Sequence, residues 1–192
     1  MTKVKCKTIY TIGHSMHSLD EFITLICHYH ITFVADVRAF PYSRRNRDYN
    51  GNVLSEALGK VNVIYRHFPE LGGRRPRSRT VAPTINAFWR VQSFHNYADY
   101  ALSDEFQKGL ATLIEASRYE TVVLMCAEVL WWRCHRRIIS DYLLSKGLTV
   151  IHILSLTNTQ EGVLTSGAVV EPTGCLTYPL PESVCVQNDE KS

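Results

Sequence analysis

Five short apolar segments recur within the first 154 residues, and amphipathic or turn-rich stretches separate them. Each segment contains β-branched residues and is bounded by turn residues or by a helical pattern, which is typical of buried strands. We therefore predict strands at 7–12, 31–37, 61–68, 121–126 and 149–154.

Helical periodicity marks three of the stretches between these strands. Ser18 and Glu21 have the spacing of a capping box, so a helix is expected to begin there. Related patterns precede the fourth and fifth predicted strands. The apolar positions are Leu19, Phe22, Ile23 and Ile26 in the first helix, Phe106, Leu110, Leu113 and Ile114 in the second, and Ile138, Ile139, Tyr142 and Leu143 in the third.

The alternation of strands and helices predicts a single α/β domain with a mostly parallel sheet of about five strands and helices on both faces. Residues 1–154 are expected to form this domain. Residues 155–192 lack clear periodicity, which indicates an irregular, partly disordered C-terminal extension with one strand pair. The connections 39–52 and 69–83 are long enough to be functional or mobile loops.

Composition narrows the class of protein. The chain has 192 residues, of which 45% are hydrophobic and 20% charged, as in folded globular domains. It shows neither a signal peptide nor an apolar run near the ~20 residues that cross a bilayer, so we expect a cytoplasmic protein without a membrane partner. Six scattered cysteines favour reduced thiols over disulfides. The pattern does not define an oligomeric state or a cofactor.

Positive charge is concentrated in one part of the chain. Residues 38–90 contain ten arginines and one lysine against three acidic residues, a net charge of +8, whereas the whole chain carries +3. Arginines interleaved with aromatic residues suit phosphate binding and base stacking. The segments 44–47 and 74–79 are therefore candidate polyanion-binding loops, although a solvated basic face gives the same pattern.

Polar residues follow the first two predicted strands. After the first come Gly13, His14 and Ser15, where the histidine either faces a ligand or tethers the loop. Near the end of the second, Asp36 and Arg38 lie two positions apart and share a strand face. Asp36 is either a general base that activates water or half of a buried ion pair that supports the loop.

Cys126, Ala127 and Glu128 follow the fourth predicted strand. A thiol near a helix start and near cations favours the thiolate, as in phosphatases and sulfur transferases. The intervening residues 129–132 are bulky rather than small, so the phosphatase loop is a poor match, and we expect Cys126 to be partly structural. Cys126, Glu128, Cys134 and His135 make only a weak metal signal, and no metal site is predicted.

The helix after this loop is expected to open with a cluster of cations. Cations at a helix start oppose the helix dipole unless an anion is bound, which indicates a phosphate site. The alternative is that Arg136 and Arg137 lie on the exposed face and pair with Asp141 or Glu128. The cations are Arg133, His135, Arg136 and Arg137.

Together these motifs resemble domain of unknown function family 488, over about residues 8–153. The resemblance implies that the motifs form a common family site, but it implies no reaction. The bulky segment 129–132 departs from the more polar or proline-containing loop of the family. The matching motifs are 11–15, 36–38 with Pro41, Ser43 and Arg44, 69–74, 125–128 and 134–137.

The leading hypothesis is an enzyme that hydrolyses a glycosidic or phosphoester bond of a nucleotide or nucleic acid, with Asp36 or Glu128 activating water. The alternatives are thiol-dependent, sulfur-transfer-like chemistry at Cys126 and a nucleic-acid-binding module without catalysis. Gly13, Asp36, Cys126 and His135 are expected to line one pocket. The candidate catalytic residues are Asp36, Glu128, His14 and Cys126, and the candidate phosphate-binding residues are Ser15, Arg38, Arg44, Arg74, Arg75, His135 and Arg136.

Overall fold

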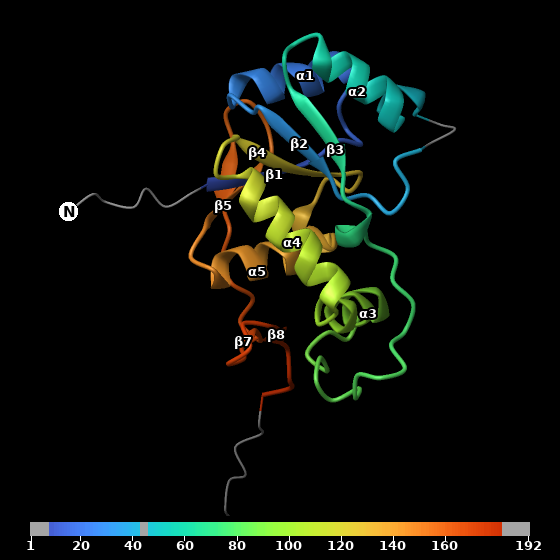
Figure 1. Cartoon of the computed structure of the whole chain (residues 1–192), viewed down its shortest axis with the longest axis vertical. Helices are drawn as coiled ribbons and strands as arrows, with labels where there is room; N and C mark the ends of the chain where they lie inside the picture. The colour runs from blue at the N-terminus through green and yellow to red at the C-terminus, as the bar shows by residue number, and fades with distance from the viewer. Residues whose placement is uncertain (1–7, 43–45, 182–192) are drawn as a thin grey trace, which may run out of the picture.

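Six strands form the central sheet of the computed structural model, which describes residues 8–42 and 46–181 (Figure 1). Their order is β3-β2-β4-β1-β5-β6, and every pair is parallel except β5 and β6. The predicted mostly parallel sheet is confirmed. The strands are β1 (Thr8–Gly13), β2 (Phe33–Asp36), β3 (Ile64–His67), β4 (Val122–Cys126), β5 (Thr149–Ile153) and β6 (Thr159–Glu161).

Five helices cover the two faces of this sheet (Figure 1). Buried side chains of α1 (Leu19–His28) and α2 (Gly51–Gly59) belong to one apolar cluster, and those of α3 (Gln92–Ala101), α4 (Asp104–Ala116) and α5 (Arg136–Ser145) belong to a second. The predicted helices on both faces are confirmed. The capping box also forms, because Ser18 N donates to Glu21 Oε2 at 2.7 Å and Glu21 N donates to Ser18 Oγ at 3.3 Å.

Three elements were not predicted. Helix α2 begins inside the expected long loop 39–52, and α3 begins beyond the loop 69–83. The third is β6, which pairs with β5 and makes six strands rather than five. All three residues of β6 are exposed and polar, so no apolar pattern marks it.

The segment after β5 is more ordered than the predicted extension. The expected strand pair forms between β7 (Val169–Val170) and β8 (Leu176–Thr177). Just beyond it, Tyr178 is fully buried and its hydroxyl donates to Asp141 Oδ2 at 3.0 Å, so this segment completes the core over α5. The disorder expected for the last residues falls on 182–192, outside the described residues.

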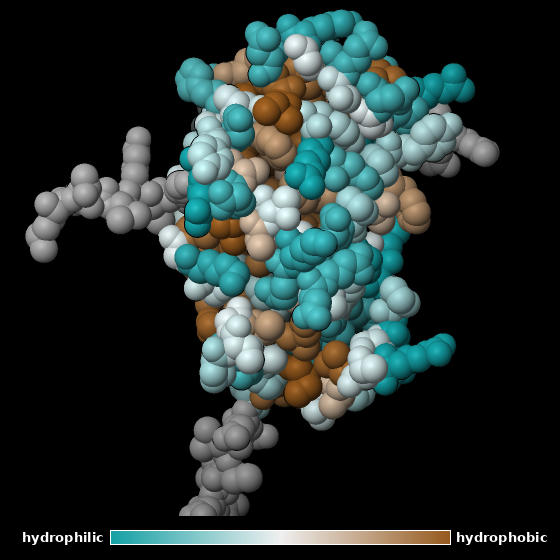
Figure 2. Space-filling model, in the orientation of Figure 1, coloured by the Kyte–Doolittle hydropathy of each residue, from teal (hydrophilic) through white to brown (hydrophobic). Residues whose placement is uncertain are grey.

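The face shown in Figure 2 is hydrophilic over much of its middle, and its hydrophobic patches include one at the end that carries β7 and β8. Val169 and Val170 of β7 are 45% and 52% exposed. Within residues 8–42 and 46–181, no helix combines the length and the apolar character required to cross a bilayer.

Gly13 allows the ends of β1 and β4 to meet. A Cβ at this position would lie 2.1 Å from the carbonyl oxygen of Glu128 and 2.6 Å from the Cα of Val129, so only glycine fits. Beyond it, His14 N donates to Cys126 O at 3.0 Å and Ser15 N to Ala127 O at 3.1 Å. The chain leaving β1 is thereby bonded to the chain leaving β4.

We predict that Gly13→Ala lowers the free energy of unfolding by about 3 kcal/mol, because the added methyl group meets backbone that cannot rotate away. The matched control is Gly59→Ala, where a Cβ meets no atom within 4 Å. Urea denaturation of both variants measures the difference. Equal stability of the two variants would show that the loop after β4 yields freely.

Candidate functional site

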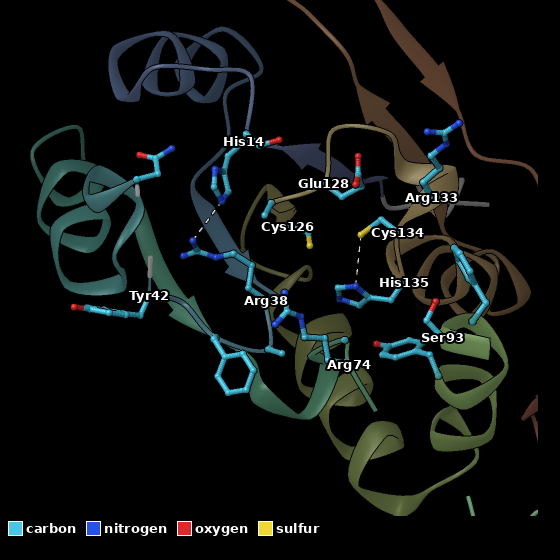
Figure 3. A pocket seen from close by; sticks show the side chains of 18 residues that line it. His14, Arg38, Tyr42, Arg74, Ser93, Cys126, Glu128, Arg133, Cys134 and His135 are labelled. Carbon is cyan, nitrogen blue, oxygen red and sulfur yellow. Dashed lines mark hydrogen bonds between the residues drawn. The ribbon is translucent and has the colours of Figure 1, made fainter. Parts of the chain in front are cut away.

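A cavity of about 1090 Å³ opens beside the carboxyl ends of β1, β2 and β4, next to the start of α5 (Figure 3). This is where the parallel topology places a ligand site, because β1 and β4 are neighbours whose following helices cover opposite faces of the sheet. The cavity brings together the following predicted residues: His14, Ser15, Arg38, Arg74, Cys126, Glu128 and His135.

Four other predicted residues do not line the cavity: Gly13, Asp36, Arg75 and Arg136. Gly13 and Asp36 do not line the cavity, although both were expected there. Arg75 lies beyond its wall, where its guanidinium stacks 3.7 Å from the ring centroid of Tyr100 and its Nε donates to Gly72 O. Arg44 falls outside the described residues.

Asp36 is fully buried, and its carboxylate forms an ion pair with Arg38. Its carboxylate accepts hydrogen bonds from the backbone nitrogen of Arg38 at 3.0 Å, from Arg38 Nε at 2.8 Å and from the hydroxyl of Tyr65 at 2.6 Å. Of the two sequence-based alternatives, the geometry matches the buried ion pair that supports the loop. The pair fixes the guanidinium of Arg38 at the edge of the cavity.

His14 completes this group as a neutral ring. It stacks on Tyr49 with centroids 3.9 Å apart, and its Nε2 lies 3.3 Å from Arg38 NH1. Burial, and then the charge of Arg38, lower the pKa of His14 to about 4. Near pH 7 the unprotonated Nε2 therefore accepts a hydrogen bond from Arg38, which leaves the proton on Nδ1.

A second group joins two cysteines to His135. The sulfurs of Cys126 and Cys134 lie within 4.8 Å of each other, and Cys134 Sγ lies 3.5 Å from His135 Nδ1 (Figure 3). His135 Nε2 lies 2.8 Å from the carbonyl oxygen of Val37, which can only accept, so Nε2 carries a proton. The remaining ring nitrogen, Nδ1, can therefore take the proton of the Cys134 thiol.

Arg136 donates a hydrogen bond to the same sulfur, Cys134 Sγ. It is 1% exposed, its Nε donates to Cys134 Sγ at 3.4 Å, and its NH2 donates to the carbonyl oxygens of Glu128 and Val129. Arg136 does not line the cavity, so the structure does not match its predicted role in binding phosphate or the alternative of an exposed surface pair. Among the described residues, no carboxylate lies within ion-pair distance of this guanidinium.

The two thiols have pKa values shifted in opposite directions. Burial by itself would raise the pKa of Cys134, but the hydrogen bond from Cys126 and the influence of His135 and Arg136 hold that pKa well below its usual value. The hydrogen bond with Cys134, followed by burial, raises the pKa of Cys126. The lowered pKa favours the thiolate at Cys134, and the raised pKa favours the protonated thiol at Cys126.

Sequence reasoning named Cys134 but did not select it as a catalytic candidate. Its position beside His135 and just before α5 was the signal that pointed to it. Of the aromatic residues that line the cavity, Tyr42 belongs to the basic segment 38–90, whose interleaved aromatic residues were expected to suit base stacking. The other three, Phe40 after β2 and Phe94 and Tyr97 on α3, were missed.

The two sulfurs and a nitrogen of His135 lie within 4.8 Å of one another, a spacing that suits three ligands of a metal ion. The surroundings favour an anion instead. Arg136 already donates to Cys134 Sγ, and Arg38, Arg74 and Arg133 line the cavity, where Glu128 is the single acidic residue among those that the structure describes. We therefore treat these side chains as a thiol cluster rather than as metal ligands.

Comparison with curated proteins finds no match, and comparison with solved structures finds none either. One protein-family model does match, over residues 18–143. This range contains the ends of β2 and β4, the thiol cluster and most of α5. The chain therefore belongs to the family described as domain of unknown function DUF488.

Proposed function

We propose that this protein is a thiol-dependent enzyme that acts on a phosphate-bearing substrate, with Cys134 as its nucleophile. The observation that carries the proposal is the surroundings of Cys134 Sγ. His135 and Arg136 contact this sulfur, the sulfur of Cys126 lies within 4.8 Å of it, and Cys134 lines an open cavity. A thiolate is the reactive form of cysteine, and hydrogen-bond donors and cations favour it.

The charges around the cavity support an anionic substrate. Arg38 is held in place by Asp36, and exposed Arg74 and Arg133 line the same cavity. Glu128 is the one acidic lining residue in the described part of the chain. Guanidinium groups bind phosphate through paired hydrogen bonds. The start of α5 adds the positive end of a helix dipole on the side of Cys134.

Aromatic side chains at the cavity favour a nucleotide among phosphate-bearing substrates. Phe40 and Tyr42 are each 68% exposed although both line the cavity, and Phe94 and Tyr97 lie on its α3 side. Exposed rings beside arginines suit base stacking. A nucleotide, or the end of a nucleic acid, thus remains the proposed substrate. The proposed location remains the cytoplasm, whose reducing conditions keep thiols in the reduced form.

Hydrolysis by an activated water is the weaker candidate. It needs a carboxylate that faces the substrate, and Asp36 is committed to Arg38 and Tyr65. Glu128 is left as the candidate base, because it is exposed and lines the cavity. Loss of turnover in Glu128→Gln together with full activity in Cys134→Ser would favour this candidate over thiol chemistry.

Alkylation should reveal the thiolate. We expect iodoacetamide to label Cys134 at a rate that reaches its plateau at lower pH than the rate at exposed Cys27, because the thiolate persists above a lowered pKa. Peptide mass spectrometry between pH 5 and 9 measures both rates. In His135→Gln, the pH at which the alkylation rate of Cys134 reaches half of its plateau should rise by about one unit or more, since the favourable interaction of His135 with the thiolate is lost. Coincident profiles of Cys134 and Cys27 in the wild type would contradict the proposal.

Phosphate recognition is tested by protection of Cys134. We predict that adenosine monophosphate slows alkylation of Cys134 and that adenosine alone does so far more weakly. Arg74→Gln should raise the half-protecting concentration about tenfold, because one charge-assisted hydrogen bond is lost. Arg77→Gln, an exposed arginine outside the cavity, is the matched control. Equal protection by nucleoside and nucleotide would remove phosphate from the proposal.

A further inference from the structure

A nucleophilic cysteine has no evident need of a second thiol, yet Cys126 shares the cavity wall with Cys134. Their two sulfurs lie within 4.8 Å of each other, and both residues border the open space (Figure 3). Among the described cysteines, Cys27 and Cys175 do not line the cavity. The arrangement is a spatial pair of thiols at a site open to a substrate.

We propose that Cys126 and Cys134 are a redox-active dithiol that reduces a disulfide substrate bearing an anionic group. This inference rests on the proposed function, because Cys134 is the attacking thiolate in both. It adds the kind of bond attacked and a chemical role for Cys126. The cations at the cavity then select the substrate by its charge, and the two sulfurs carry out the reaction.

The reaction has two exchange steps. The Cys134 thiolate attacks a substrate R–S–S–R′, a bond forms from Cys134 Sγ to the sulfur that carries R, and R′–S⁻ leaves. Cys126 then loses its proton to R′–S⁻ or to His135 and attacks Cys134 Sγ, which releases R–S⁻. Two electrons pass from the protein to the substrate, and the protein ends with a Cys126–Cys134 disulfide. A dithiol reductant regenerates it by the same exchange.

The contacts assign the two cysteines to different steps. Cys134 is held at its sulfur by Arg136 and His135, which favours the thiolate that begins the first step. Cys126 lies at the end of β4 with its sulfur within 4.8 Å of Cys134 Sγ, where a neighbouring negative charge opposes loss of its own proton, so that proton is retained until the first step has removed the negative charge from Cys134. Both sulfurs are within 4.8 Å of each other and of a nitrogen of His135, so the second step takes place between neighbouring side chains of one cluster.

His135 is the group that can carry the proton between the steps. Its Nδ1 lies 3.5 Å from Cys134 Sγ and its Nε2 is held by the carbonyl of Val37, so the ring keeps one orientation. A Cβ on Gly73 would lie 2.9 Å from Nδ1, so only glycine leaves this edge of the ring room beside the cavity. The ring therefore stays beside both sulfurs during exchange.

The test uses the full-length reduced protein and oxidised glutathione, a disulfide that bears carboxylates. We expect wild type to lose two hydrogens and to yield linked peptides that contain Cys126 and Cys134. Cys126→Ser should stop at a stable glutathione adduct on Cys134. Cys134→Ser should form neither product, and Cys175→Ser, outside the cavity, should behave as wild type.

The charge of the substrate is a separate readout. The neutral disulfide of 2-mercaptoethanol should oxidise wild type more slowly than oxidised glutathione, and Arg74→Gln should reduce that preference about tenfold. The peptide map of the wild-type protein tests the dithiol directly, so the test does not depend on the folding of any variant. A stable adduct on Cys134 of wild type with Cys126 still free overturns the dithiol but leaves the Cys134 nucleophile in place. No reaction at Cys134 with glutathione or iodoacetamide refutes both proposals.

Discussion

Arg136 carries a charge that is buried at the start of α5, and a buried charge is costly unless it is balanced where it lies. No carboxylate among the described residues pairs with it, so two backbone carbonyls and the sulfur of Cys134 accept its hydrogen bonds. The same guanidinium thus fixes the shape of the loop after β4 and supplies the counter-charge for a thiolate. The loop and the nucleophile depend on one interaction.

The sheet places this interaction beside the rest of the site. The loop held by Arg136 is the loop against which Gly13 packs, so the ends of β1 and β4 are held at one distance. On the other side of β4, the Asp36 and Arg38 pair ends β2 and Arg38 contacts His14 from β1. Three strand ends are therefore tied to one another through buried polar contacts, and the cavity between them is preorganised.

The fold was largely predictable because the buried strands carry β-branched residues. Their sequence pattern reveals each of these strands without knowledge of the strand it pairs with. Strand β6 was not predictable, since its exposed residues Thr159–Glu161 form a strand only through pairing with β5. Helix α2 was missed because Gly51 and Gly59 stand at its two ends, where they weaken the helical pattern. Strand-end motifs predicted seven of the residues that line the cavity, but the burial of Arg136 and Asp36 depends on tertiary packing that spacing does not show.

The hydrogen bonds to Cys134 also have a thermodynamic consequence for the dithiol. Arg136, His135 and Cys126 all stabilise the reduced, anionic sulfur, and a disulfide would forfeit much of that stabilisation. Stabilising the reduced form shifts the reduction potential of a cysteine pair toward more oxidising values. The pair would then be a mild reductant that is easily regenerated, and its substrates would be strained or readily cleaved sulfur bonds rather than the stable disulfides of folded proteins.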